Sequence, residues 1–408
     1  MTGNISAVFG THDEKTLEQL RDVGSRAERV ALMADGHVGY VMPIGGVAAY
    51  DNKASVVGVG FDIACGNAAI RTNLTIEAFD RPMLDHIANE IQRQISFGIG
   101  RKNESSDAPV DDPLFESPAW EALREVAGKH EHDALWKKAR QQLGTVGSGN
   151  HYVDVFADET GTLWVGVHFG SRGLGHTIAS GFLSLSQGKR WGERVRETEV
   201  LLDLSQPLGE AYWHLMELAG AYAYAGREWV ARQVVGILGG RELEIVHNHH
   251  NFAWKEQHDG RELVVVRKGA TPAFPGQRGF VGGSMGDDAV IIEGATNGDE
   301  SLQRATMYST VHGAGRVMSR TAARGKVRGW GPKARVVEPG KLTWDMVKEW
   351  LGPRGVILRG GGLDEAPHAY RRLPDVLAAQ GDTIRVLHTL RPLVVVMAGE
   401  NEFDPYKD

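Results

Sequence analysis

The sequence has only one cysteine among its 408 residues, and it has no long apolar run. A single cysteine excludes an intrachain disulfide and fits a reducing compartment, so we expect a cytoplasmic protein. The longest clear apolar run covers only residues 393–398, far short of the roughly 18 residues that a membrane span needs. The N-terminus also lacks a basic segment followed by an apolar one, so we expect neither secretion nor membrane insertion.

The sequence also lacks an excess of positive charge, because 52 acidic residues outnumber 45 basic ones and leave a formal net charge of −7. This balance argues against a protein that coats nucleic acid indiscriminately, since such binding depends on lysine and arginine. Residues 316–335 are an exception, with seven basic residues and no acidic one: Arg316, Arg320, Arg324, Lys326, Arg328, Lys333 and Arg335. Such a segment is either a solvated basic surface or a local field that attracts a polyanion.

Glycine, in contrast, is abundant: 52 residues is near twice the usual share of about 7%. Many of these glycines flank histidines. Glycine permits positive φ and close backbone approach, so such turns can direct N–H groups at a phosphate or hold a side chain beside a metal. Tight turns in a sheet-rich fold are the simpler explanation for any one of them.

Helical and strand patterns alternate along the whole chain. Amphipathic spacing predicts helices at 13–23, 80–96, 121–128, 132–143 and 302–310, and one kinked helix or a helical pair at 208–238. Apolar, β-branched segments predict strands at 45–50, 55–60, 67–72, 242–247, 263–267, 289–293, and 385–390 with 393–396. No repeat or interdomain linker appears. The chain length permits one large domain or two or three ordinary ones, and the polar residues at about 100–113 predict a mobile loop.

Asp62 and Cys65 place a carboxylate and a thiol three positions apart, in the turn expected between two strands. Together with imidazoles, these groups suit Zn²⁺, Fe²⁺ or Mn²⁺. Histidines in comparable glycine-rich settings are His151, His168, His249, His250 and His312. A structural zinc site would more often show a Cys-x-x-Cys pair. Three other interpretations stay open: Cys65 as a small buried residue, Cys65 as a protease nucleophile with a histidine and Asn150, and each histidine as a structural residue.

His312 differs from the other histidines because it follows an expected helix and precedes Gly-Ala-Gly-Arg. Backbone amides of such a turn, with Arg316, are suited to hold phosphates, and a neutral imidazole there can attack phosphorus. A histidine at an ordinary turn in a basic region is the alternative.

Several motifs together resemble the RtcB family of 3′-phosphate RNA ligases, in the family's order and over most of the chain. They are residues 35–39 (DGHVG), 43–49 (PIGGVAA), 58–66 (GVGFDIACG), 147–151 (GSGNH), 168–173 (HFGSRG), 249–251 (HHN), 267–271 (RKGAT), 283–286 (GSMG), 309–316 (STVHGAGR) and 364–367 (DEAP). As a set they are far more specific than any single glycine turn. The resemblance implies one large α+β domain over 1–408, with mixed sheets, glycine-rich turns and peripheral helices around a central metal cleft, and a C-terminal extension at about 399–408.

The resemblance implies an enzyme of tRNA splicing or RNA repair with two Mn²⁺ ions and GTP as cofactors. Cys65 would bridge the ions, with His168 and His250 completing one site and Asp62 and His151 the other. His312 would become guanylylated, and GMP would pass to an RNA 3′-phosphate before a 5′-hydroxyl end displaces it. A 2′,3′-cyclic phosphate would first be hydrolysed at the same site. Whether the enzyme requires an activating partner protein stays open.

The same resemblance implies a nucleotide pocket and a phosphate-binding set. The nucleotide residues would be Asn150, Asp154, Gly283, Ser284, Met285, His312, Gly313, Ala314, Gly315 and Met397. The phosphate and RNA contacts would be Arg172, Lys268 and Arg316, since arginine offers a planar fork and lysine a point charge.

The chain departs from the family pattern at three positions. Asp154 stands where the family has a guanine-contacting glutamate, Met397 replaces a guanine-contacting lysine, and Pro272 replaces an arginine. These changes alter nucleotide and RNA surfaces while the ligand set and His312 stay intact. Two alternatives to a ligase follow: a metal-dependent RNA cyclic phosphodiesterase or 3′-end hydrolase that does not seal, and a catalytically silent RNA-binding protein.

Overall fold

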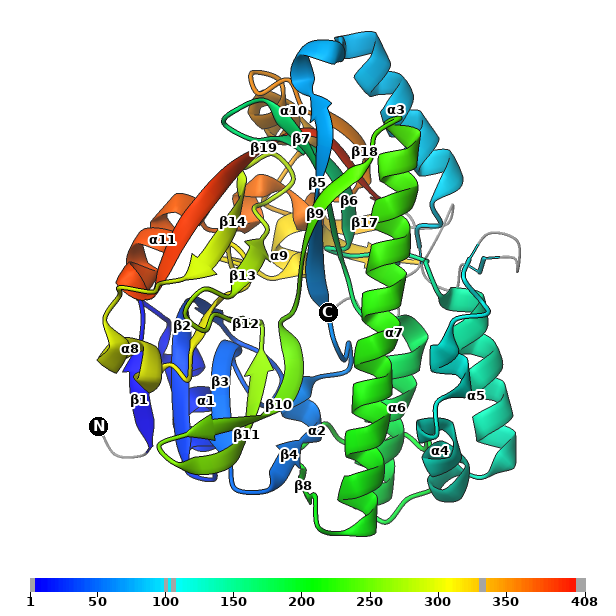
Figure 1. The fold of residues 1–408 in the computed structure, drawn as a ribbon, viewed down its shortest axis with the longest axis vertical. Coiled ribbons are helices and arrows are strands. Elements are labelled where there is room, and N and C mark those ends of the chain that lie inside the picture. The colour runs from blue at the N-terminus through cyan, green and yellow to red at the C-terminus, as the bar shows by residue number, and fades with distance from the viewer. Residues whose placement is uncertain (1–3, 99–101, 104–107, 330–334, 401–408) are drawn as a thin grey trace.

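The computed structural model describes residues 4–98, 102–103, 108–329 and 335–400, in which two large sheets lie beside a layer of helices (Figure 1). The α+β class that the sequence predicts is confirmed. The eight-stranded sheet has the order β13 (Arg278–Val281), β14 (Ala289–Gly294), β19 (Ile384–Gly399), β6 (Tyr152–Ala157), β7 (Thr162–Phe169), β5 (Gly66–Thr75) and β9 (Glu242–His249), with β18 (Ile357–Gly361) also pairing with β19. The five-stranded sheet has the order β1 (Ile5–Val8), β2 (Arg29–His37), β3 (Ile44–Tyr50), β11 (Arg261–Lys268) and β10 (Asn251–His258).

Three two-stranded ribbons and a set of helices complete the described chain. The ribbons pair β12 (Ala270–Pro272) with β15 (Ser309–Val311), β16 (Gly325–Arg328) with β17 (Arg335–Pro339), and β4 (Lys53–Ser55) with β8 (Leu201–Asp203). The α-helices are α1 (Glu14–Gly24), α2 (Val56–Val59), α3 (Arg81–Gln94), α4 (Ala119–Ala127), α5 (Lys129–Gln142), α6 (Arg172–Ser186), α7 (Pro207–Ile237), α8 (Glu300–Ala305), α9 (Arg320–Arg324), α10 (Trp344–Leu351) and α11 (Leu373–Gln380). Among the described helices, none is both long and apolar enough to cross a membrane.

The eight-stranded sheet sorts its side chains by the period of two that every strand imposes. Val153 and Val155 of β6, with Val165 and Val167 of β7, pack on one face against the C-terminal part of α7. Tyr152 and its neighbours at every second position face the other way. The register pairs Tyr152 with His168, so these two rings share the opposite face and stack with centroids 5.4 Å apart.

Helix α7 is one continuous helix of 31 residues and connects the two parts of the core (Figure 1). Its N-terminal half, including Tyr212 and Leu215, packs in the cluster that covers one face of the five-stranded sheet. Val230 and Val234 of its C-terminal half pack against the eight-stranded sheet instead. The sequence left open whether 208–238 forms one helix or two, and the structure has one.

Two local predictions were wrong. Residues 55–60 were expected to form a strand, but Val56–Val59 form a helical turn whose N-cap, Ser55, accepts a hydrogen bond from the Gly58 amide at 2.8 Å. The helix expected at 302–310 ends at Ala305, because Met307 and Tyr308 adopt positive φ and the chain then enters β15. The loop expected at 100–113 lies partly outside the described residues, as does the expected extension beyond Glu400.

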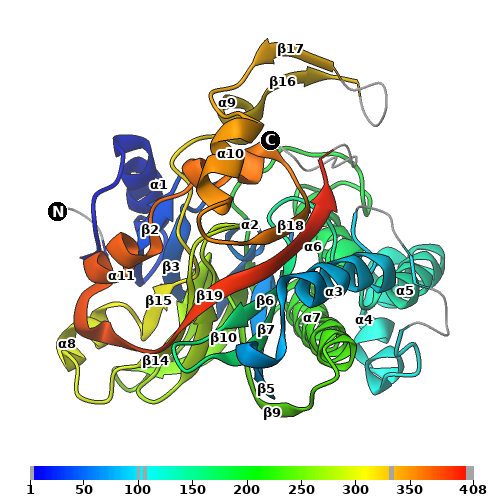
Figure 2. The same ribbon diagram turned by 90° about the horizontal axis from the view of Figure 1, so that it is seen from above.

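The β16–β17 ribbon projects from the body of the protein above α9 (Figure 2). Both ends of the ribbon are tied to α9, since the amides of Lys341 and Leu342 donate to the carbonyls of Ala322 and Ala323 at 2.9 and 3.0 Å. At the ribbon's first residue, Gly325, φ is +92° and a Cβ would lie 2.2 Å from the Glu338 carbonyl oxygen, so only glycine fits. The ribbon is therefore attached at a fixed place.

Candidate metal centre and nucleotide cavity

Cys65 lies at the start of β5, at a point where three strands of the eight-stranded sheet meet. Gly66 pairs with Phe169 at the end of β7 on one side and with His249 at the end of β9 on the other. The His250 amide donates to the Cys65 carbonyl at 2.8 Å. Strand register thus brings Cys65, His168 and His250 together although they are far apart in the sequence.

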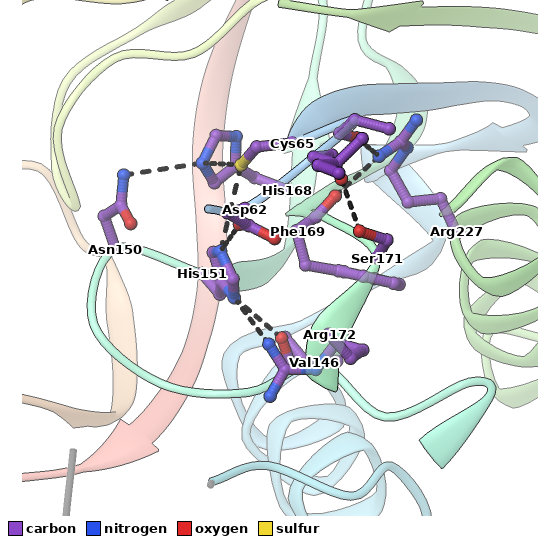
Figure 3. A network of polar contacts seen from close by, with 12 residues as sticks. Asp62, Cys65, Val146, Asn150, His151, His168, Phe169, Ser171, Arg172 and Arg227 are labelled. Carbon is purple, nitrogen blue, oxygen red and sulfur yellow. Dashed lines mark hydrogen bonds and ion pairs between the residues drawn. The ribbon is translucent and has the colours of Figure 1, made fainter. Parts of the chain in front are cut away.

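Two groups of donor atoms share the Cys65 sulfur, and Figure 3 shows four of the five residues, Asp62, Cys65, His151 and His168. Cys65, His168 and His250 form one group, Asp62, Cys65 and His151 form the other, and within each group the donor atoms lie within 4.8 Å of one another. The Cys65 Sγ lies 3.6 Å from His168 Nε2 and 3.8 Å from His151 Nε2, and His151 Nε2 lies 3.1 Å from Asp62 Oδ2. The five residues expected as ligands are therefore in one place.

The glycine after β7 makes room for the Asp62 carboxylate. A Cβ on Gly170 would lie 2.1 Å from Asp62 Oδ1, so a larger residue would displace this oxygen from the donor group. Ala64, between the two donors, has φ +61°, a conformation that an L side chain rarely adopts. The Asp62–Cys65 loop is therefore tightly constrained.

Other contacts fix which ring nitrogens face the shared sulfur. His168 Nδ1 lies 2.6 Å from Asn67 Oδ1, and His151 Nδ1 lies 2.8 Å from the Val146 carbonyl oxygen. These partners favour a proton on Nδ1 and leave Nε2 of both rings as the donor, the arrangement usual around metal-binding histidines. The buried Nδ1 of His250 has no hydrogen-bond partner among the described residues. A metal ion at this place would satisfy it.

The ionisation of the donors also fits a divalent cation. Burial lowers the pKa of His168 and His250 well below the ordinary value, so both rings are neutral, as ligands must be. Burial raises the pKa of Asp62, but the hydrogen bond and charge of His151 outweigh it and the net shift is downward. Burial and the Asp62 charge raise the pKa of the Cys65 thiol well above its ordinary value. Metal binding must therefore displace the thiol proton.

Arg227 of α7 lies next to the loops that carry the donors and contacts their backbone (Figure 3). Its guanidinium is fully buried and donates to the carbonyls of Ala64 and Phe169 at 2.9 and 2.6 Å, the residues directly before Cys65 and after His168. It also contacts His247 Nε2 and His249 Nδ1, both at 2.9 Å. One side chain thus joins all three strands that carry the donors.

His312 follows β15 and lies beside the donor cluster, with its ring centroid 4.9 Å from that of His250. Its Nδ1 lies 2.6 Å from Oδ2 of Asp35, a fully buried carboxylate on β2 that also accepts from the amides of His312 and Gly313 at 3.0 and 3.2 Å. Burial raises the pKa of Asp35, but the charge and hydrogen bond of His312 outweigh it, so the pKa is lowered. Asp35 Oδ2 is thus positioned to hold a proton on His312 Nδ1, which makes Nε2 the ring nitrogen on the side away from the carboxylate.

A cavity of about 510 Å³ opens in front of His312 and His168. Every residue expected to contact the nucleotide lines it: Asn150, Asp154, Gly283, Ser284, Met285, His312, Gly313, Ala314, Gly315 and Met397. The volume is in the range of small-molecule sites.

One wall of this cavity carries a buried acid beside apolar side chains. Asp154 of β6 and Met397 of β19 lie on adjacent strands, with Val395 opposite Asp154 in the register. The Asp154 Oδ1 has no hydrogen-bond partner among the described residues, and burial raises the pKa of this carboxyl well above its ordinary value. Burial thus favours the protonated form of Asp154, which can both donate and accept a hydrogen bond.

The three expected phosphate contacts lie in different environments. Arg316 lines the cavity, but its guanidinium also donates to the Asp364 carbonyl at 2.7 Å and to Tyr370 Oη at 2.9 Å. Arg172 lies next to His151, with its Nη1 3.4 Å from His151 Nδ1. Lys268 is buried and donates to the Val57 carbonyl at 2.9 Å, and neither it nor Arg172 is among the residues that line the cavity.

The basic segment 316–335 is less uniform than the sequence indicates. Arg316 and Arg320 pair with Glu365, and Arg324 lies 3.9 Å from Asp364, so two buried acids from another part of the chain offset two of these three charges. Lys333 lies outside the described residues. A basic field over the whole segment is therefore wrong for its first part.

Sequence reasoning gave no function to Asp35 or Arg227. Each had a signal, since each is a charged residue inside an apolar element: Asp35 ends the run 30–34 on β2, and Arg227 follows an alanine- and tyrosine-rich stretch of α7. A buried charge needs a partner and is therefore informative.

The α+β fold and a cavity bordered by donor atoms and a carboxylate-held histidine have the organisation of an enzyme active site with room for metal ions. The family model for tRNA-splicing ligase RtcB matches residues 17–398, and the chain belongs to this family.

Similar proteins include the tRNA-splicing ligases RtcB of Thermococcus kodakarensis, at 32% identity over 94% of this chain and 91% of the relative, and of Archaeoglobus fulgidus, at 33% over 89% and 86%. The RNA-splicing ligase RtcB of Escherichia coli K12 is 31% identical over 90% of both chains.

Proposed function

We propose that this protein is an RNA ligase that joins ends carrying a 3′-phosphate or a 2′,3′-cyclic phosphate to ends carrying a 5′-hydroxyl. Membership of the RtcB family and relatives named tRNA-splicing ligases support this class. The observation that carries the chemistry is the Asp35–His312 pair, 2.6 Å apart and next to a donor cluster that shares one sulfur.

His312 Nε2 would attack the α-phosphorus of GTP, so that an N–P bond forms and the bond to pyrophosphate breaks. The GMP would then pass to the RNA 3′-phosphate, and a 5′-hydroxyl oxygen would attack the activated end and release GMP. Asp35 would keep the Nδ1 proton in place and stabilise positive charge on the ring during the first step.

The donor set would hold two Mn²⁺ ions, Asp62 and His151 at one and His168 and His250 at the other, with the Cys65 sulfur shared. Bound there, such ions would neutralise phosphate charge and act as Lewis acids. The amides of Ala314 and Gly315 and the Arg316 side chain, all on the cavity wall, would orient the phosphates.

Incubation of Mn²⁺-loaded protein with labelled GTP or ATP tests the first step. We expect a covalent nucleotide on the wild type and none on His312→Ala, and an adduct that survives this substitution would refute the assignment. RNA ends supplied with and without nucleotide test the rest of the reaction. Joined product supports a ligase, whereas opening of a cyclic phosphate or loss of the terminal phosphate alone supports a non-sealing hydrolase.

A further inference from the structure

Two arginines of the projecting β16–β17 ribbon lie opposite each other on neighbouring strands. Arg328 and Arg335 are directly opposite in the antiparallel register, both are exposed, and neither has an ion-pair partner within the part of the chain that the structure describes. Side chains opposite each other in such a pair lie on the same face, and like charges there repel. The ribbon therefore keeps two unpaired positive charges together at a cost to its own stability.

The rest of the ribbon makes this pair unusual. Lys326, on the same strand as Arg328, pairs with Glu338 at 3.3 Å. Nearer the cavity, Arg316, Arg320 and Arg324 pair with Asp364 and Glu365. Among the described residues of the basic segment, the arginines without an ion-pair partner are thus at its far end.

The ribbon is exposed along its whole second strand, where Val336 and Val337 are 60% and 47% exposed. An isolated two-stranded ribbon is only marginally stable in water. Here α9 supports it, because the backbone of residues 341 and 342 is bonded to that helix. An exposed ribbon with a fixed base is suited to contact something that lies across it.

The ribbon also has a fixed place relative to the site. Arg320, the first residue of α9, lines the cavity that His312 borders, and Gly325 begins the ribbon directly after the last residue of α9. At 1.5 Å per residue, α9 spans only about 6 Å between its first and last Cα atoms. An RNA strand whose end lies at His312 and that extends over α9 would run toward the ribbon that carries Arg328 and Arg335 (Figure 2).

We propose that the β16–β17 ribbon is an RNA-binding arm, in which Arg328 and Arg335 contact backbone phosphates of the substrate strand outside the catalytic cavity. This proposal rests on the proposed function, because RNA is the polyanion that function brings to the site. Charge complementarity selects RNA over a protein partner, since the two guanidinium groups form planar forks that match phosphate oxygens.

The test compares wild type with Arg328→Gln/Arg335→Gln by measuring affinity for a short labelled RNA with a 3′-phosphate at several salt concentrations. For single strands each phosphate contact contributes about 0.7 to the slope of log affinity against log salt, so the slope should become shallower by about 1.4. The control Arg190→Gln/Arg385→Gln removes two exposed arginine charges elsewhere on the surface, and its slope should stay unchanged.

Labelling of His312 by nucleotide, measured without RNA, should be equal in all three proteins. Arg328→Lys/Arg335→Lys, which keeps both charges, should retain the wild-type slope. An unchanged slope in the glutamine variant, or an equal loss in the control, would overturn the RNA-binding arm, and the first of these results is also the one expected if the ribbon binds a protein. Failure of the proposed function is distinguishable, because wild type would then neither label His312 nor join RNA ends.

Discussion

Asp35 is a single buried charge that contacts the ring of His312 and so fixes the position of that ring. Replacing it by Asn keeps the shape and an oxygen acceptor at the place of Oδ2, which faces both backbone amides and His312 Nδ1, but it removes the negative charge beside the ring. We expect Asp35→Asn to slow labelling of His312 by about 10²-fold or more, because a neutral amide does not stabilise positive charge on the ring as a carboxylate does in comparable triads. The rate of adduct formation under excess nucleotide measures this.

Thermal unfolding serves as the control for Asp35→Asn, since both amides that bond to Asp35 can still find an oxygen acceptor. A variant that unfolds like wild type and labels at the wild-type rate would contradict a positioning role for Asp35. Loss of labelling together with loss of the fold would indicate a structural role instead.

Cys65 is the donor that both groups share, so its loss should affect two metal sites at once. We expect Cys65→Ser to bind fewer than half as many Mn²⁺ ions per chain as wild type, since a neutral hydroxyl is a much weaker ligand than a thiolate. Metal analysis after dialysis gives the count. Asp62→Asn is the matched comparison, because it touches only the second group and should reduce the content less.

Lys268 offers a test of pH dependence, because burial lowers its pKa to about 8 from 10.5. Between these pH values the unfolded chain binds the proton more tightly, so folding becomes more favourable as pH rises through this window. Relative to Lys268→Met, the wild-type free energy of unfolding should increase by about 1 kcal/mol from pH 7.5 to pH 9. Denaturant unfolding of both proteins at the two pH values measures the difference, and parallel pH profiles would contradict it.

At the scale of secondary structure, α7 matters because it brings Arg227 under three strands that carry donors. Arg227→Met would leave the carbonyls of Ala64 and Phe169 buried without their donor, so we expect a loss of about 3 kcal/mol in the free energy of unfolding. Arg227→Lys keeps the charge but cannot reach all four acceptors. Its free energy of unfolding should therefore be larger than that of Arg227→Met.

Metal affinity separates positioning by Arg227 from bulk stability. If Arg227 holds the Cys65 and His168 backbones in register, Arg227→Lys should bind Mn²⁺ about tenfold or more weakly, as losses of supporting contacts commonly do. Titration with Mn²⁺ well below the unfolding temperature measures this. Val230→Ala, one turn away in the core, is the control and should lose stability with unchanged affinity.

The elements also show where sequence patterns were sufficient and where they were not. The helix expected at 80–96 is confirmed as α3, because Asp80 caps it and Pro82 starts it as the sequence indicates. The strand expected at 55–60 was a wrong prediction. Valine favours strands, but this preference is worth less than about 1 kcal/mol, and packing and the Ser55 cap override it. Such overrides depend on tertiary contacts that no local pattern contains.

At the scale of the whole molecule, the cavity is assembled from β6, the loop after β13, the turn after β15 and β19, which are far apart in sequence. All ten residues that the resemblance assigns to the nucleotide line this cavity, since a family motif collects residues that the fold brings together. The resemblance did not reveal that Asp364 and Glu365 pair with the arginines at 316–324, because pairing across about 40 residues leaves no local pattern.

The base end of the cavity gives a prediction that needs the whole fold, because it joins Asp154 of β6 to Met397 of β19. A protonated Asp154 donates and accepts at once, which matches the N1 and N6 edge of adenine, whereas an ionised one accepts twice and matches the N1–H and N2–H edge of guanine. Met397 supplies no charge that would favour ionisation. We therefore expect wild type to label His312 with ATP at a rate within about tenfold of that with GTP, since one buried polar contact discriminates by about 1–3 kcal/mol.

Met397→Lys should reverse this balance. An ammonium at position 397, diagonal to Asp154 across the strand pair, lies close enough to lower the pKa of the carboxyl and favour its ionised form. The ratio of GTP to ATP labelling rates should then rise about tenfold, while Met397→Leu, which adds no charge, should leave it unchanged. If the lysine variant folds and labels but keeps the wild-type ratio, Asp154 does not read the base, and selectivity must come from the backbone of the cavity wall.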